Sequence, residues 1–194
     1  MNLKNNDPIQ VHILASHENF RIAAAVVDAW PSSRDEIVAG FHQRLGALLM
    51  EKLNGWEWHP YGAKNDTFFV DNCAGFSFWK STWNDYYLCL MAGNFGAKMA
   101  FGVVREKPTI GNRPFCDELF RAVRDIHPSA TRNGWWEAVI KMRAPAADWR
   151  SPDVLWRMHT DQTFLDNVAT QILEVARISE PLIDRLTRKY APSE

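Results

Sequence analysis

The sequence predicts an α+β fold, with an antiparallel β-meander of about five to six strands flanked by N-terminal helices and a long C-terminal helix. Apolar residues recur at helical spacing over residues 33–53. The pattern then changes to short runs rich in aromatic and β-branched residues. A long helical stripe returns after residue 160. We therefore expect residues 1–8 to form a flexible tail and residues 9–194 to form one domain, with its sheet core at about 55–142.

The N-terminal region is predicted to hold two separate helices. Residues 10–14 fit either a short strand or the lead-in to a helix. Residues 18–30 have helical apolar spacing, and Pro31 is expected to end that helix, because the residue before a proline is pushed out of the α region. Ser33 to Glu36 fits a capping box, which predicts a second helix from there to Asn54-Gly55.

The middle of the chain is predicted to form the sheet. The expected strands are residues 56–59, 67–71, 75–80, 85–91 and 98–105, followed by Trp135 to Met142. Short turns separate the first five, and connections this short require antiparallel pairing. In one of these strands Phe76 and Phe78 point to one face and Trp79 to the other, so Trp79 is expected on the opposite face of the sheet.

Three helical segments are predicted in the second half of the chain. Residues 115–126 carry an apolar stripe, and His127-Pro128 ends it. Ser151-Pro152 is typical of a helix start, with serine at the cap and proline in the first turn. The last long helix is expected to begin near Thr160 or Asp161, and Pro181 is expected to kink or split it.

Composition limits the classes of function. Among 194 residues the net charge is −1, so the chain has no global electrostatic footprint for nucleic acid. The three cysteines, Cys73, Cys89 and Cys116, have no C-x-x-C spacing, which favours a reducing compartment. The longest uncharged apolar-rich run, residues 86–97, is shorter than the roughly 20 residues that span a bilayer. We expect a cytoplasmic protein that does not enter a membrane.

Signatures of catalysis are missing from the sequence. The closest histidine pair, His12 and His17, lacks the i, i+4 spacing of a zinc-protease helix. There is no G-x-S-x-G nucleophile motif, and residues 93–96 lack the strand–loop–helix setting of a phosphate site. We therefore predict no catalytic residue, no metal ligand and no cofactor. An enzyme whose site is assembled from distant residues stays an alternative, and its candidates are His59, Asp66, Asp71 and His159.

A group of aromatic and cationic residues is the best candidate for a binding site. Its members lie in or near neighbouring strands and turns: Trp79, Lys80, Trp83, Tyr86, Arg105, Lys107 and Arg113. Aromatic rings beside cations could stack bases and neutralise phosphates. They could equally anchor a protein partner. They could also form a second core layer, with the cations extending to the surface.

The order of aromatic motifs resembles that of a known family. A helix leads into Gly-Trp-x-Trp at residues 55–58, and Gly-Phe-x-Phe-Trp-Lys follows at 75–80. Trp83 to Tyr86, Gly102-Val103 and Trp135-Trp136 come next. Over about residues 33–190 this layout resembles the C-terminal, non-nuclease portion of bacterial and phage PD-(D/E)XK-type proteins related to restriction and defence nucleases.

The resemblance implies an accessory domain that binds a partner or positions nucleic acid. It carries over no catalytic residue, because a PD-(D/E)XK site needs an acid two residues before its lysine and Lys80 has none. The sequence thus predicts a recognition domain that binds a protein partner in a bacterial or phage defence or counter-defence setting. A nucleic-acid-binding module associated with a nuclease is the second interpretation, and the oligomeric state is open.

Overall fold

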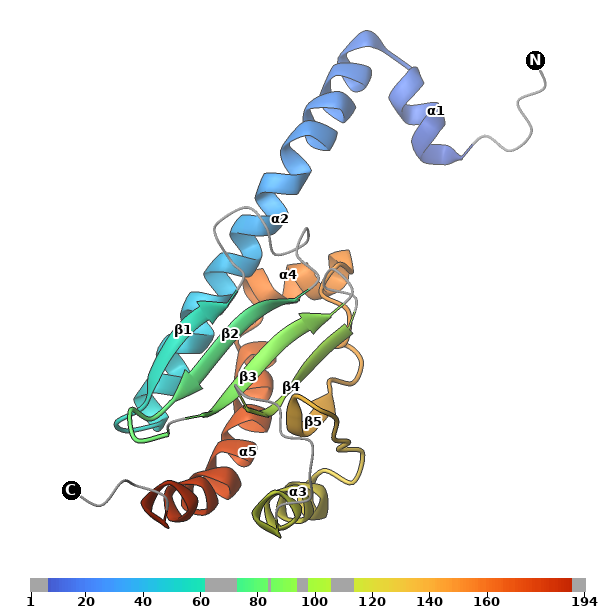
Figure 1. Cartoon of the computed structure of the whole chain (residues 1–194). Coiled ribbons are helices and arrows are strands. Elements are labelled where there is room, and N and C mark those ends of the chain that lie inside the picture. The colour runs from blue at the N-terminus through green and yellow to red at the C-terminus, as the bar shows by residue number, and fades with distance from the viewer. Residues whose placement is uncertain (1–6, 62–72, 84, 94–97, 106–113, 190–194) are drawn as a thin grey trace.

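A five-stranded antiparallel sheet forms the centre of the molecule (Figure 1). The computed structural model describes residues 7–61, 73–83, 85–93, 98–105 and 114–189. Each strand pairs with its neighbours in the sequence, in the order β1-β2-β3-β4-β5, which confirms the predicted antiparallel meander. The strands are β1 (Glu57–Tyr61), β2 (Cys73–Trp79), β3 (Tyr86–Gly93), β4 (Lys98–Arg105) and β5 (Trp136–Lys141).

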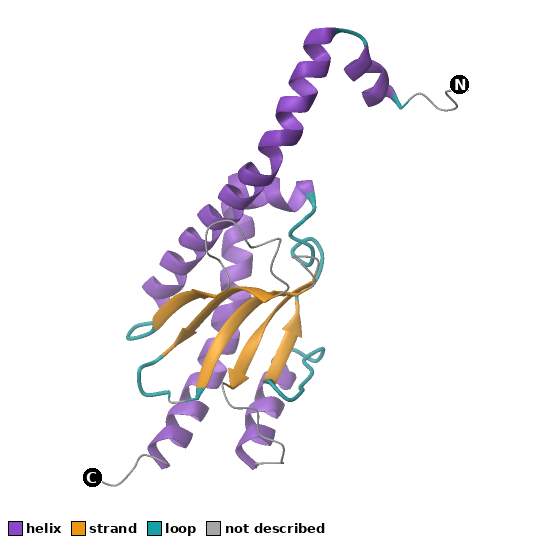
Figure 2. Cartoon of the chain, turned by 45° about the horizontal axis from the view of Figure 1, so that its top comes forward, coloured by secondary structure: helices purple, strands orange, loops and turns teal. Residues whose placement is uncertain are grey.

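Five helices accompany the sheet among the described residues, which confirms the mixed α+β class. They are α1 (Pro8–Leu14), α2 (His17–Lys52), α3 (Pro114–Ile126), α4 (Pro152–Thr160) and α5 (Gln162–Lys189). The second half of α2 and most of α5 lie against the same face of the sheet (Figure 2). Within the described part of the chain, no helix combines the length and the apolar composition needed to cross a membrane.

The predicted strand positions hold where the structure describes them. The bounds of β4 coincide with the predicted run at 98–105, and the run at 67–71 lies outside the described residues. Gly102 has φ +152°, and a Cβ there would lie 2.1 Å from the carbonyl oxygen of Ala138 on β5. Only glycine fits at this close approach of β4 to β5.

The core lies between the sheet and the helices behind it. Phe76 on β2 and Phe101 on β4 are fully buried on the covered face, and Phe41 on α2 packs into the same cluster. The ring of Trp149 meets that of Phe41 edge-on, with centroids 5.4 Å apart. Its indole N–H donates to the carbonyl oxygen of Ala146 at 3.1 Å, so the polar atom of this buried ring is satisfied.

The two predicted N-terminal helices are in fact one, and the predicted stop at Pro31 is wrong. α2 runs without a break from His17 to Lys52 with Pro31 inside it. A helical proline frees the carbonyl four residues earlier, here that of Val27, and this part of the helix is exposed, so water can satisfy the group. The Ser32 hydroxyl donates to the Ala29 carbonyl at 3.0 Å. The expected capping box at Ser33 is therefore a stretch of helix interior.

The start of α2 is capped elsewhere. The Ser16 hydroxyl accepts a hydrogen bond from the backbone N–H of Asn19 at 3.1 Å, as an N-cap does. α1 precedes this cap, and the Asn19 side chain donates to the His12 carbonyl at 2.8 Å, which ties the two helices together. The run at 10–14 is thus helical rather than extended. In the last helix Pro181 lies inside α5, which is not split.

Candidate functional site

Two of the predicted binding residues, Lys80 and Trp83, lie at one end of the sheet, beside α5. Trp83 is 4% exposed, and its indole N–H donates to the carboxylate of Asp184 at 2.6 Å. The Lys80 ammonium bonds the same carboxylate at 3.1 Å and also pairs with Glu180. Burial opposes the charge on Lys80, but hydrogen bonds and attraction from both carboxylates outweigh it and raise the pKa of Lys80. These contacts hold α5 against the end of the sheet.

Two further members of the predicted site form a buried polar group between β3, β4 and α3. The guanidinium of Arg105 lies 5.6 Å from the ring centroid of Tyr86, and its Nη1 is 3.9 Å from a carboxylate oxygen of Glu137. Burial raises the pKa of Tyr86 and of the neighbouring Cys116 thiol. A thiol held protonated in this way is a poor nucleophile. The group is therefore suited to packing rather than to chemistry.

Most of the predicted binding residues that the structure describes are buried rather than exposed. Trp83, Tyr86 and Arg105 are at most 6% exposed. Trp79 and Lys80 are half-buried, and Lys107 and Arg113 lie outside the described residues. The physical reason is that α5 supplies the carboxylates that pair with Lys80 and Trp83, and β5 supplies Glu137 beside Arg105. A second core layer, the third of the interpretations considered, matches this arrangement.

The two described residues named for an enzyme site, His59 and His159, lie on different elements. His59 is an exposed residue of β1, and His159 lies in the last turn of α4, where its ring is 6.1 Å from that of Trp156. Asp66 and Asp71 lie outside the described residues. In the ranges that the structure describes, no three side chains of His, Cys, Asp or Glu come together as a metal site would require.

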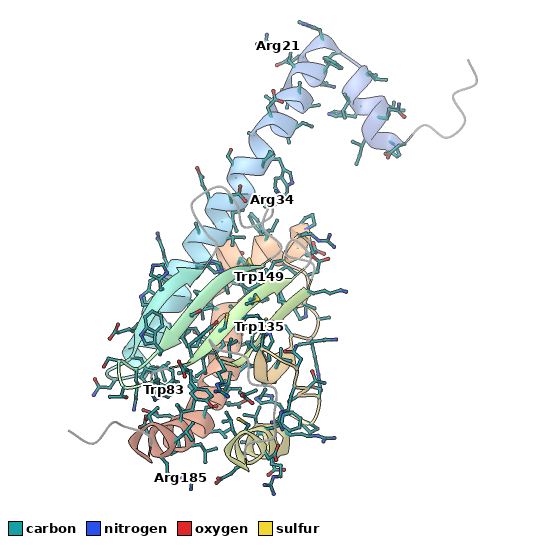
Figure 3. All side chains as sticks on the ribbon, viewed as in Figure 1. Arg21, Arg34, Trp83, Trp135, Trp149 and Arg185 are labelled. Atoms are coloured by element: carbon teal, nitrogen blue, oxygen red, sulfur yellow. The ribbon has the colours of Figure 1, made fainter. Side chains whose placement is uncertain are left out.

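The most prominent surface feature is a helical arm, which we define as residues 7–34. It comprises α1 and the first half of α2, and it projects from the rest of the molecule (Figure 1). Arg21 lies near its tip and Arg34 where α2 reaches the sheet (Figure 3). The buried residues of α2 begin only at Val38. The arm therefore adds nothing to the core.

The arm carries most of the exposed apolar side chains of the described residues. Of the eleven large hydrophobic residues that are exposed, eight lie on it: Ile9, Val11, Leu14, Phe20, Ile22, Val26, Val27 and Trp30, between 42% and 70% exposed. The other three, Ile126, Trp135 and Trp156, lie singly on other elements. Scattered apolar residues are normal on a surface, whereas a concentration of them marks an interaction site.

A shallow cavity of about 410 Å³ is the second surface feature. It lies along β5 and beside the start of β4, and its lining includes Lys98, Lys141, Trp136 and Asn133. Lys98 and Lys141 are exposed, and Trp136 is half-buried. Cations and an aromatic ring that line one cavity can attract a phosphate and stack a base.

Comparison with protein families, with curated proteins and with solved structures finds no match to this chain. The sequence shows the helical spacing of Phe20, Val27 and Trp30 but not which surface this stripe faces. The structure shows that this stripe is exposed, and nothing in the sequence signals that exposure.

Proposed function

We propose that this chain is a non-catalytic recognition domain that binds a protein partner through the apolar surface of the arm. The observation that carries the proposal is the concentration of eight exposed hydrophobic side chains on residues that bury nothing in the core. Leaving them in water is costly, because each large apolar side chain gains about 1.5–3 kcal/mol on full burial. A protein partner with a matching apolar groove would recover that free energy.

The charge of the arm supports a protein rather than nucleic acid. Its basic residues are Arg21 and Arg34, and its acidic residues are Asp7, Glu18 and Asp28. Binding to phosphates or to an anionic lipid surface requires an excess of cations. The arm has a slight excess of acidic residues, so it does not attract nucleic-acid phosphates or an anionic lipid surface.

The resemblance of the aromatic motifs to the non-nuclease portion of PD-(D/E)XK-type proteins supports a setting in bacterial or phage defence or counter-defence. In that setting a recognition domain acts by stoichiometric binding. Nucleic acid is the second candidate ligand, and one observation favours it: the cavity that Lys98, Lys141 and Trp136 line. Binding there would weaken steeply with salt.

The test uses an arm variant with the substitutions Phe20→Gln, Val27→Gln and Trp30→Gln. Glutamine is a good helix former, so the helix is kept while its apolar surface is lost. We expect wild-type chain used as bait in a lysate of its source cells to capture specific proteins that the arm variant fails to capture. Nuclease treatment of the lysate should leave that difference unchanged.

A matched control variant carries Ile126→Gln, Trp135→Gln and Trp156→Gln. These three side chains are 53% to 66% exposed and lie outside the arm. The control should capture the same proteins as the wild type. Equal capture by the arm variant and the wild type would sink the proposal, and capture that disappears with nuclease treatment would favour the cavity and nucleic acid instead.

A further inference from the structure

The apolar residues of the arm follow the spacing of a coiled-coil seam. Phe20, Ala23, Val27 and Trp30 are separated by three, four and three residues. This is the a-d-a-d order of a heptad repeat, in which one narrow stripe of a helix packs against a second helix. α1 is tied to the start of α2 through the hydrogen bond from Asn19 to the His12 carbonyl, and Phe20, Val27 and Trp30 remain exposed.

The positions that flank the seam carry no Asp, Glu, Lys or Arg. In heptad terms they are the e and g positions, and they are occupied by His17, Asn19, Ala24, Val26, Pro31 and Ser33. The charged residues Glu18, Arg21 and Asp28 fall at the b and f positions, away from the seam. Charges at e and g are the usual means by which a coiled coil selects a different partner. Their absence favours a partner whose seam is equally apolar and uncharged.

We infer that the occupant of this surface is the arm of a second copy of the chain, packed antiparallel. The inference rests on the proposed function and names its partner. In the antiparallel arrangement Phe20 of one copy faces Trp30 of the other, and Ala23 faces Val27, so aromatic rings meet at the ends and small residues near the two-fold axis. The interface is isologous, as in most homodimers.

The shape of the chain agrees with this arrangement. The arm leads into the sheet and its covering helices at the C-terminal end of the exposed stretch (Figure 1). Antiparallel packing places the two sheets at opposite ends of the paired arms, so they do not collide. A parallel pairing would bring both to the same end.

The exposed area is sufficient for a stable dimer. The eight apolar side chains of the arm are 42% to 70% exposed, which amounts to on the order of 800 Å² for side chains of this size. A standard interface buries about 800 Å² on each partner. Burying most of this area requires Ile9, Val11 and Leu14 of α1 to join the interface, because Ile22 lies at a c position, away from the seam on α2.

Sedimentation velocity of the purified chain over a series of concentrations tests the inference. We expect the wild type and the control variant to pass from monomer to dimer with the same dissociation constant. The arm variant should raise that constant at least tenfold, because buried aromatic anchors dominate interface energies. Far-UV circular dichroism of both variants shows that a lost dimer does not reflect a lost fold.

A spin label at Ser33→Cys tests the orientation. Ser33 is exposed and lies eight residues from the proposed axis near residue 25, so two labels in an antiparallel dimer stand about 24 Å apart along the helix axis. In a parallel dimer they stand at about the interhelical distance of 10 Å. A measured separation above 20 Å supports the antiparallel pair, and strong dipolar broadening overturns it. The variant Ser33→Ala, labelled identically, corrects for label on the native cysteines.

The outcomes separate the two proposals. A wild-type chain that stays monomeric at every concentration overturns the second-copy inference. If the arm variant then still loses proteins that the wild type captures, recognition of another protein through the arm stands. If the monomeric wild type and the arm variant capture the same proteins, both proposals fail. A dimer that the arm variant retains unchanged also overturns the inference.

Discussion

Replacing Trp149 by alanine is expected to lower the free energy of unfolding by about 4 kcal/mol, the usual range for loss of a buried tryptophan being about 3–5 kcal/mol. The side chain is fully buried, and its ring packs edge-on against Phe41 and lies 5.4 Å from that of His42. Removing it leaves a cavity between α2 and the segment before α4. It also removes the indole donor to the Ala146 carbonyl. Equilibrium unfolding in urea gives the value directly.

Trp156→Ala is the matched control, because this tryptophan is 66% exposed. Its loss should change the free energy of unfolding by no more than about 0.5 kcal/mol, as is usual for surface positions. A cost below about 1 kcal/mol for Trp149→Ala, or equal costs for the two variants, would contradict the position of Trp149 in the core.

Lowering the pH from 7 to 5 is expected to remove about 2 kcal/mol of stability through His42 alone, at about 1.4 kcal/mol per pH unit once below the unfolded pKa. Burial lowers the pKa of His42 from 6.5 to about 3. Below pH 6.5 the unfolded chain takes up a proton that the folded chain excludes, so protonation favours unfolding. The loss continues until the pH reaches about 3, where the folded form also titrates.

The measurement is the free energy of unfolding at several pH values for the wild type and for His42→Met, which keeps a side chain of similar volume. We expect the variant to show a shallower pH dependence, and the difference between the two slopes to isolate His42. Identical slopes would mean that His42 titrates alike in the folded and unfolded chains.

The sheet could be predicted from sequence because its signals are local. Alternating apolar residues and short turns define β4 at 98–105, and the aromatic run from Gly75 places β2. The short connections then leave antiparallel pairing as the only arrangement. The apolar stripe of residues 115–126 predicts α3, and Ser151-Pro152 predicts the start of α4.

The long α2 could not be predicted, because a proline usually ends a helix and Pro31 does not. Exposure decides the outcome. The helix around Pro31 is exposed, so water can bond the carbonyl that the proline frees, and the helix continues. The sequence shows the proline but not the surroundings. The same error concealed the arm, since a helix that ends at Trp30 would be expected to fold back onto the sheet.

The burial of the candidate binding residues could not be predicted, because the residues that pair with them are distant in sequence. Lys80 and Trp83 are neighbours in the chain, but the carboxylate that holds both belongs to Asp184, about a hundred residues later. Arg105 is likewise held near Glu137 on the adjacent strand. Local patterns show aromatic and charged residues alternating, and only the packing of α5 and α3 decides whether they face a partner or the interior.

The central claim is that the apolar residues of the arm serve a partner rather than the fold. Urea unfolding of the arm variant at low protein concentration, followed by far-UV circular dichroism, tests it most directly. The account predicts that each of the three substitutions contributes a change of no more than about 0.5 kcal/mol to the free energy of unfolding. A loss of several kcal/mol, comparable with that of Trp149→Ala, would place Phe20, Val27 and Trp30 in the core and contradict the claim.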